Sequence, residues 1–164
     1  MAVQLRVSVT RYAVRHSSLI RLIERILSLI GESKAELSVS LVGDTRIRRL
    51  NRDFREKDRS TDVLAFPIRE AMMPPGVRCP AGMLGDVVVS VPTAVRQAKQ
   101  AARSVHDELA TLFVHGVLHL CGYDHERNAR EAARMFKRER AILRRLAPVP
   151  RLIAPQREKK KKRS

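Results

Sequence analysis

Cysteine and large aromatic residues are scarce in this 164-residue chain, and each shortage excludes a class of protein. The two cysteines, Cys79 and Cys121, are too few for a disulfide framework, so we expect unpaired thiols in a reducing compartment. Four Phe, two Tyr and no Trp argue against the aromatic platforms on which single-strand-binding proteins stack bases. A chain of this length is expected to form one domain rather than two.

Long apolar runs are missing as well. No stretch of about eighteen apolar residues occurs, which excludes a transmembrane helix. The residues from Val3 to Val9 alternate between apolar and polar, and the chain shows no basic start, apolar stretch and cleavage site of a secretory signal. We therefore expect a cytoplasmic protein with no membrane partner.

Positive charge is what the chain has in excess. Its 33 Lys and Arg outnumber 17 Asp and Glu, for a formal net charge of +16. The final residues 151–164 hold seven of these bases and one Glu, so residues 1–150 keep a net charge of +10. Charge of this sign and size predicts a polyanionic partner, nucleic acid first and an anionic membrane surface second. Because aromatic residues are few, we expect contact with backbone phosphates.

The apolar periodicity predicts an α+β fold, a single domain with a mixed four-stranded sheet covered by about five helices. Strands are expected at residues 3–9, 36–42, 62–66 and 87–91, and helices at residues 17–30, 44–54, 92–102 and 104–120, with a last helix that begins at residue 128. Three prolines and two glycines predict a loop at residues 70–82. We expect the domain to span residues 1–146 and a basic, disordered tail to follow at residues 147–164.

The most informative stretch reads His115-Gly-Val-Leu-His119-Leu-Cys-Gly-Tyr-Asp-His125. Helical residues four apart share a face, so His115 and His119 can present both imidazoles to one ion. Gly122 permits the chain reversal that would bring His125 to the same ion. Three imidazoles leave a fourth tetrahedral position open, as in catalytic zinc sites, although copper, nickel and iron accept the same ligands. The spacing predicts one ion, zinc first, on a zincin-like helix, with Cys121 the weaker alternative for a fourth ligand.

The same spacing occurs in the metalloprotease signature H-E-x-x-H-x-x-G-x-x-H, but Gly116 stands where that signature has its catalytic glutamate. Peptide hydrolysis is disfavoured because the carboxylate that activates water is missing. A phosphodiester fits better, since zinc polarises a phosphoryl oxygen and lowers the pKa of its water towards about 7. Asp124 beside the third histidine is either a base or support for a ligand, or it caps the turn.

Three blocks together resemble the YbeY family of bacterial endoribonucleases, the rRNA maturation factors. The blocks are residues 50–67, 84–90 and 115–125, and the resemblance extends over residues 3–146. It implies one zinc ion held by the three histidines, a mixed sheet with surrounding helices, and single-strand-specific RNA cleavage. It further implies a role in 16S rRNA 3′-end maturation and ribosome quality control. The expected partner is thus ribosomal RNA of the small subunit rather than DNA, with protein partners left unspecified.

The resemblance also assigns a role to Arg55, because the family's functional arginine follows an aromatic residue in the first block. A guanidinium can bind phosphate in a bidentate fork, so Arg55 is expected to clamp the substrate opposite the metal. The expected catalytic residues are Arg55, His115, His119 and His125.

The chain departs from the family's common pattern at three positions, where Phe54, Ser60 and Ala65 replace tyrosine, proline and serine. None of them is an expected metal ligand, but Ser60 is expected to loosen the loop after Arg55. Two other functions stay open at this point. One is an RNA-binding ribosome-assembly factor with a mainly structural metal, and the other is a metalloprotease-like amide hydrolase.

Overall fold

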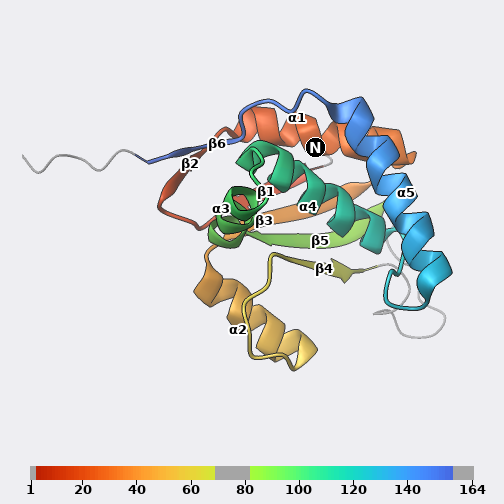
Figure 1. Cartoon of the computed structure of the whole chain (residues 1–164), viewed down its shortest axis with the longest axis horizontal. Coiled ribbons are helices and arrows are strands. Elements are labelled where there is room, and N and C mark those ends of the chain that lie inside the picture. The colour runs from red at the N-terminus through yellow and green to blue at the C-terminus, as the bar shows by residue number, and fades with distance from the viewer. Residues whose placement is uncertain (1–2, 69–81, 157–164) are drawn as a thin grey trace, which may run out of the picture.

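A four-stranded mixed sheet separates two unequal helical layers in the computed structural model, which describes residues 3–68 and 82–156 (Figure 1). The strand order is β1-β3-β5-β4, in which the parallel strands β1 (Val3–Val7), β3 (Glu36–Val42) and β5 (Met83–Ser90) are followed by the antiparallel β4 (Val63–Pro67). The predicted α+β fold with a mixed four-stranded sheet is therefore confirmed.

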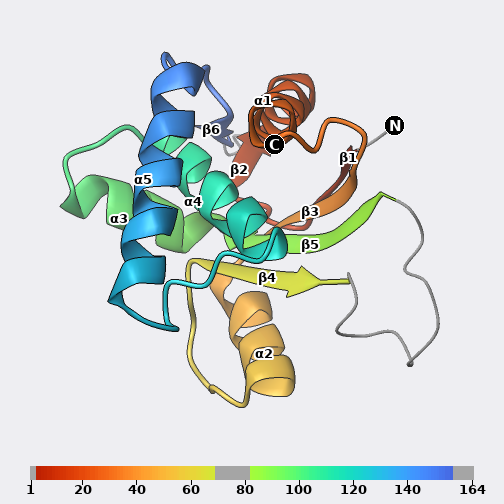
Figure 2. The same ribbon diagram turned by 90° about the vertical axis from the view of Figure 1, so that its right-hand side faces the viewer.

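The helices cover the two faces of the sheet unequally (Figures 1 and 2). One face carries α1 (His16–Ile30), α4 (Val105–Leu120) and α5 (Ala129–Leu146), with α3 (Val91–Gln100) beside α4, whereas α2 (Asp44–Arg55) lies on the other face. Within the described ranges we find no helix long and apolar enough to cross a membrane.

The alternation of β3 decides which face of the sheet becomes the core. Leu37, Val39 and Leu41 are buried, whereas Ser38 and Ser40 between them are only half-buried. The buried set packs with the apolar stripe of α1 and with most of α4 in one cluster. Helix α4, which packs in this cluster, also bears two of the residues of the site described below.

Strand β5 begins earlier than the predicted residue 87, because Gly85 and Asp86 interrupt the apolar run that marks it in the sequence. The register against β3 shifts between Glu36 and Leu37, next to Gly85. Gly85 has a φ of 143°, and a Cβ there would lie 2.2 Å from the carbonyl oxygen of Phe66. The backbones of β4 and β5 thus approach at a point that only glycine allows.

A second, two-stranded sheet was not predicted. Strand β2 (Tyr12–Val14) pairs antiparallel with β6 (Ile153–Pro155), and Leu152 is fully buried. The prediction of disorder from residue 147 onward is therefore wrong for residues 152–155. Strands of only three residues are too short to show a periodicity, so each is recognised only by its partner strand. The rest of the predicted tail from residue 157, most of the predicted loop and Cys79 lie outside the described residues.

His106 in the first turn of α4 fixes this C-terminal segment. Its Nδ1 accepts a hydrogen bond from the backbone N–H of Leu152 at 3.1 Å. Partial burial lowers the pKa of His106, and the charges of Arg151 and Arg15 lower it further against the opposing charge of Asp107. Only the neutral imidazole can accept this bond at Nδ1.

We expect acid to loosen the C-terminal segment. Because the pKa of His106 is lower in the folded chain than its usual 6.5, the stabilisation is complete above that value and is lost as the pH falls through the lowered pKa. Hydrogen-exchange protection of the Leu152 amide, corrected for the intrinsic rate, should fall between about pH 7.5 and about pH 5. The Ser8 amide, bonded to Leu41 O at 3.0 Å, is the internal control.

His106→Ala should show weak protection at Leu152 at both pH values. Protection in the unsubstituted chain that does not change with pH would show that His106 does not hold the segment.

Candidate metal centre

Helix α4 presents two histidines from an otherwise buried surface. Its start is set by Ser104, whose hydroxyl accepts a hydrogen bond from the N–H of His106 at 3.1 Å. Core contacts surround most of the helix, but His115 and His119, one turn apart, are only partly buried. Their imidazoles therefore reach the edge of the core on one face.

The turn after α4 returns the chain towards those histidines. Gly122 has a φ of 98°, its N–H donates to the carbonyl of His119, and the N–H of Tyr123 donates to the carbonyl of Leu118. This pair of bonds is a Schellman motif, which ends the helix and reverses the chain. His125 thereby comes back over the end of α4.

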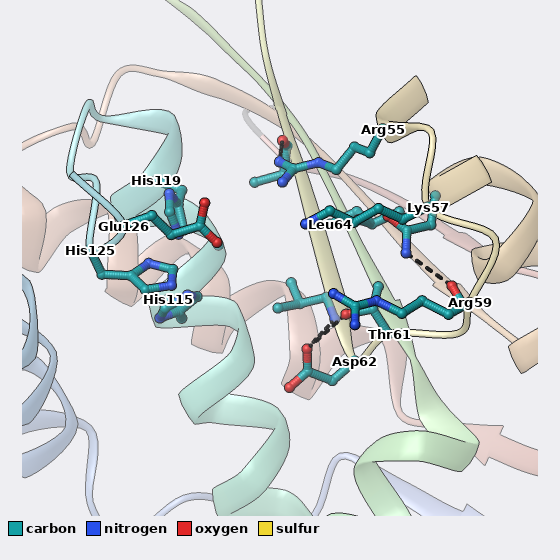
Figure 3. Close-up of a pocket in the computed structure, with 14 residues that line it drawn as sticks. Arg55, Lys57, Arg59, Thr61, Asp62, Leu64, His115, His119, His125 and Glu126 are labelled. Atoms are coloured by element: carbon teal, nitrogen blue, oxygen red, sulfur yellow. Dashed lines mark hydrogen bonds between the residues drawn. The ribbon is translucent and has the colours of Figure 1, made fainter. Parts of the chain in front are cut away.

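The three histidines converge as the spacing predicted (Figure 3). Their ring centres lie 4.8 to 5.1 Å apart, and each offers a nitrogen within 4.8 Å of the others. In the part of the chain that the structure describes, this is the group of His, Cys, Asp and Glu side chains able to hold a metal ion. Cys121 is not part of it and packs against the core, so the structure does not support it as a fourth ligand.

The charge state of the centre suits a metal bound by imidazoles. Partial burial lowers the pKa of His119, and the neighbouring His115, His125 and Arg55 lower it further, against the opposing charge of Asp124. A lowered pKa favours the neutral imidazole, which is the form that binds metal. The donor set and its electrostatics therefore fit a metal ion.

The two carboxylates after α4 have different roles. Asp124 Oδ1 accepts a hydrogen bond from the N–H of Glu126 at 3.0 Å, so the capping alternative is the one that the structure supports. Glu126 lines the cleft, and its carboxylate lies on the same side as the histidines and points into the cleft (Figure 3). Sequence reasoning missed Glu126, because a glutamate on an exposed turn has no distinguishing pattern.

Basic side chains form the opposite side of the same cleft, which has a volume of about 210 Å³. Arg55, the last residue of α2, lines it together with Lys57 and Arg59, and all three stand across from the histidines (Figure 3). Arg55 donates from Nη2 to the carbonyl of Ala65 at 3.3 Å, which directs it over β4. The structure thus brings Arg55 and the three histidines into one cleft, while Lys57 and Arg59 are additions that the sequence reasoning did not contain.

A buried asparagine holds this basic segment in place. Asn51, with 3% of its surface exposed, donates from Nδ2 to the carbonyl of Arg59 at 2.9 Å. The backbone carbonyl of Asn51 accepts a hydrogen bond from the N–H of Lys57 at 3.2 Å. Asn51 therefore holds the backbones of both basic residues, Arg59 through its side chain and Lys57 through its backbone carbonyl.

Asp44, the first residue of α2, fixes the other end of the segment. Its carboxylate accepts hydrogen bonds from Ser60, Ser90, Thr93 and Arg96 at 2.6 to 3.2 Å. Partial burial raises the pKa of Asp44, but the bonds from Ser90, Thr93 and Arg96 outweigh it and hold the pKa at about 2. Ser60 does not simply loosen the loop, as expected from the missing proline, because its hydroxyl joins this network.

Gly116 lets α4 lie close to the sheet. A Cβ at this position would be 2.8 Å from Cγ1 and 3.2 Å from Cγ2 of Val87, and 3.4 Å from Cγ2 of Val63. The Cβ position of Gly116 therefore faces the sheet although the residue also lines the cleft, and any side chain here, a glutamate included, would press its Cβ into Val87. This explains in packing terms why the protease glutamate is missing.

Comparison with known proteins places these features in a family. Residues 5–147 match the family model described as Endoribonuclease YbeY. Relatives of that name are 44% identical in Geobacter metallireducens, over 80% of this chain and 87% of the relative, and 39% identical in Aquifex aeolicus, over 86% and 90%. A relative from Anaeromyxobacter sp. is 51% identical over 72% of this chain, which spans only 58% of that protein.

A solved structure supports the fold. The solution structure of TM1509 from Thermotoga maritima matches with a TM-score of 0.58 at 27% identity, covering 85% of this chain and 87% of the other.

We expect Gly116→Ala to destabilise the fold by about 1–2 kcal/mol, because a clash with a β-branched core side chain outweighs the gain in helix propensity. Urea unfolding of the metal-free protein measures this change. Repeating the substitution in a Val87→Ala background should reduce its cost or turn it into a gain, since the clashing methyl groups are removed. An equal cost in both backgrounds would show that the contact with Val87 is not the cause.

Proposed function

Because the chain belongs to the YbeY family, we propose that it is a cytoplasmic, zinc-dependent endoribonuclease specific for single-stranded RNA. We further propose that it matures the 3′ end of 16S rRNA and takes part in ribosome quality control, with RNA of the small ribosomal subunit as its partner. The observation that carries this proposal is a three-histidine centre facing Arg55 across one cleft.

Each side of the cleft has a part in the proposed reaction. Bound zinc would polarise a phosphoryl oxygen and activate a water molecule. Arg55 offers a planar pair of N–H groups to the scissile phosphate, which binds it and stabilises the charge that develops there. Lys57 and Arg59 extend the same wall and attract the neighbouring phosphates of the strand.

The general base that we propose is Glu126. Among the residues that the structure describes, the carboxylates that line the cleft are those of Asp62 and Glu126. Asp62 Oδ1 already accepts a hydrogen bond from the N–H of Val63 at 2.8 Å, which commits it to the start of β4. Glu126 stands beside the histidines and is the better placed of the two to accept a proton from the attacking water (Figure 3).

The alternatives explain less of this arrangement. A purely structural metal does not account for a basic wall facing the histidines across an open cleft. A protease of the H-E-x-x-H type requires a glutamate at position 116, where the chain has glycine and an added Cβ would clash with Val87.

We expect a chelator to abolish RNA cleavage by the purified protein and added zinc to restore it, because the histidines alone cannot activate water. His119→Ala should be inactive at every zinc concentration that restores the unsubstituted protein, and its circular dichroism should show an intact fold. Gel analysis of a single-stranded RNA measures both. Cleavage by His119→Ala at the unsubstituted rate would identify a contaminating nuclease, and unfolding of this variant would favour the structural-metal alternative.

Arg55→Ala is expected to lower the cleavage rate by about 100–1,000-fold, as the loss of one charge-stabilising donor typically does. Arg55→Lys should recover only part of it, because an ammonium lacks the bidentate fork. The matched control is Arg52→Ala, which removes an exposed arginine of the same helix that pairs with Asp53 and does not line the cleft. Equal losses in the Arg55 and Arg52 variants, with zinc content unchanged, would reduce Arg55 to a contributor of general positive charge.

A further inference from the structure

Glu139 in α5 occupies a position on the buried face of the helix, where the other residues are apolar. Met135, Ile142 and Leu146 are buried along one stripe of the helix. Glu139 is four residues after Met135 and three before Ile142, so it belongs to the same stripe, and its side chain is only 14% exposed. A carboxylate on a core-facing stripe is costly unless a specific partner compensates it.

The partner of Glu139 is a proposed metal ligand. Glu139 Oε1 meets Nδ1 of His115, whose side chain is 28% exposed, and the contact joins α5 to α4. The helix itself is docked independently, because Arg138 donates from Nη2 to the carbonyl of Leu29 in α1 at 3.1 Å. Apolar contacts and Arg138 therefore position α5, so its docking does not depend on Glu139.

We propose that Glu139 is a positioning residue for the metal centre. Its carboxylate keeps the proton of the neutral His115 ring on Nδ1, which leaves the Nε2 lone pair free for an ion in the cleft. It also fixes the orientation of the ring. This inference rests on the metal site of the proposed function and adds a residue outside the three histidines.

A purely structural pairing predicts something different. If Glu139 served only to hold α5 against α4, its loss would lower the stability of the metal-free fold and leave metal affinity and the tautomer of His115 unchanged. A positioning residue affects both of the latter, since outer partners of ligating histidines typically contribute about 10–100-fold to metal affinity.

The test compares zinc affinity in Glu139→Ala, Glu139→Gln and a matched control, by competition with a chromophoric chelator. We expect Glu139→Ala to bind zinc about 10–100-fold more weakly, and Glu139→Gln, whose amide oxygen still accepts a hydrogen bond, to fall between it and the unsubstituted chain. The control is Glu131→Ala, which removes a carboxylate from the same helix that lies 3.9 Å from Arg134. Its affinity should equal that of the unsubstituted chain.

A second measurement needs no metal. Nitrogen-15 NMR of the imidazole rings in the metal-free protein should show His115 protonated on Nδ1, and a mixture of tautomers in Glu139→Ala. Unchanged affinity and tautomer in folded Glu139 variants would overturn the inference while leaving the metal site intact. Should Glu139→Ala not fold, Glu139→Gln decides the question by the same two readouts. Absence of zinc binding to the unsubstituted chain would instead refute the proposed function.

Discussion

Helix α4 and the sheet meet at Gly116, where a single added carbon would come within 2.8 Å of Val87. This close approach places the two histidines of α4 directly beside β4, at the edge of the core. The other wall of the cleft is the end of α2 and the segment after it, on the opposite side of β4 (Figure 2). A larger residue at position 116 would lift the helix from the sheet, and the distance between the two walls would change with it.

The two walls carry different chemistry because different forces hold them. The wall formed by the three histidines is held by the apolar packing of α4 against the core and by the turn at Gly122 that ends this helix. The basic wall is a loop with little apolar contact, and buried or partly buried polar groups of Asn51 and Asp44 fix it instead. Such a network keeps three positive side chains facing one cleft, although their mutual repulsion favours dispersal.

Assembly from distant parts of the chain is the common feature of the proposed site. Arg55 comes from α2, the three histidines from α4 and the turn after it, and the carboxylate that meets His115 from α5. The core formed by α1, α4, α5 and the sheet is what brings these elements together. Stability of the core and geometry of the site are therefore linked in this protein.

Much of the site and fold could be predicted, because the signals involved are local. The bounds of β3 and the end of α4 follow from alternation and from Gly122, and His115, His119 and His125 converge through eleven consecutive residues. Arg55 was predicted from the family resemblance, since a surface arginine carries no signal of its own.

The remaining features depend on partners far away in the sequence. The pairing of β2 with β6 joins segments about 140 residues apart in the sequence, and Glu139 acquires its partner only when α5 packs on α4. Lys57 and Arg59 face the histidines because Asn51 holds their loop. Sequence by itself thus determined the elements and the local metal motif, through periodicity and turn chemistry. Only the tertiary structure decided what lies across from that motif, because such contacts depend on how the core packs.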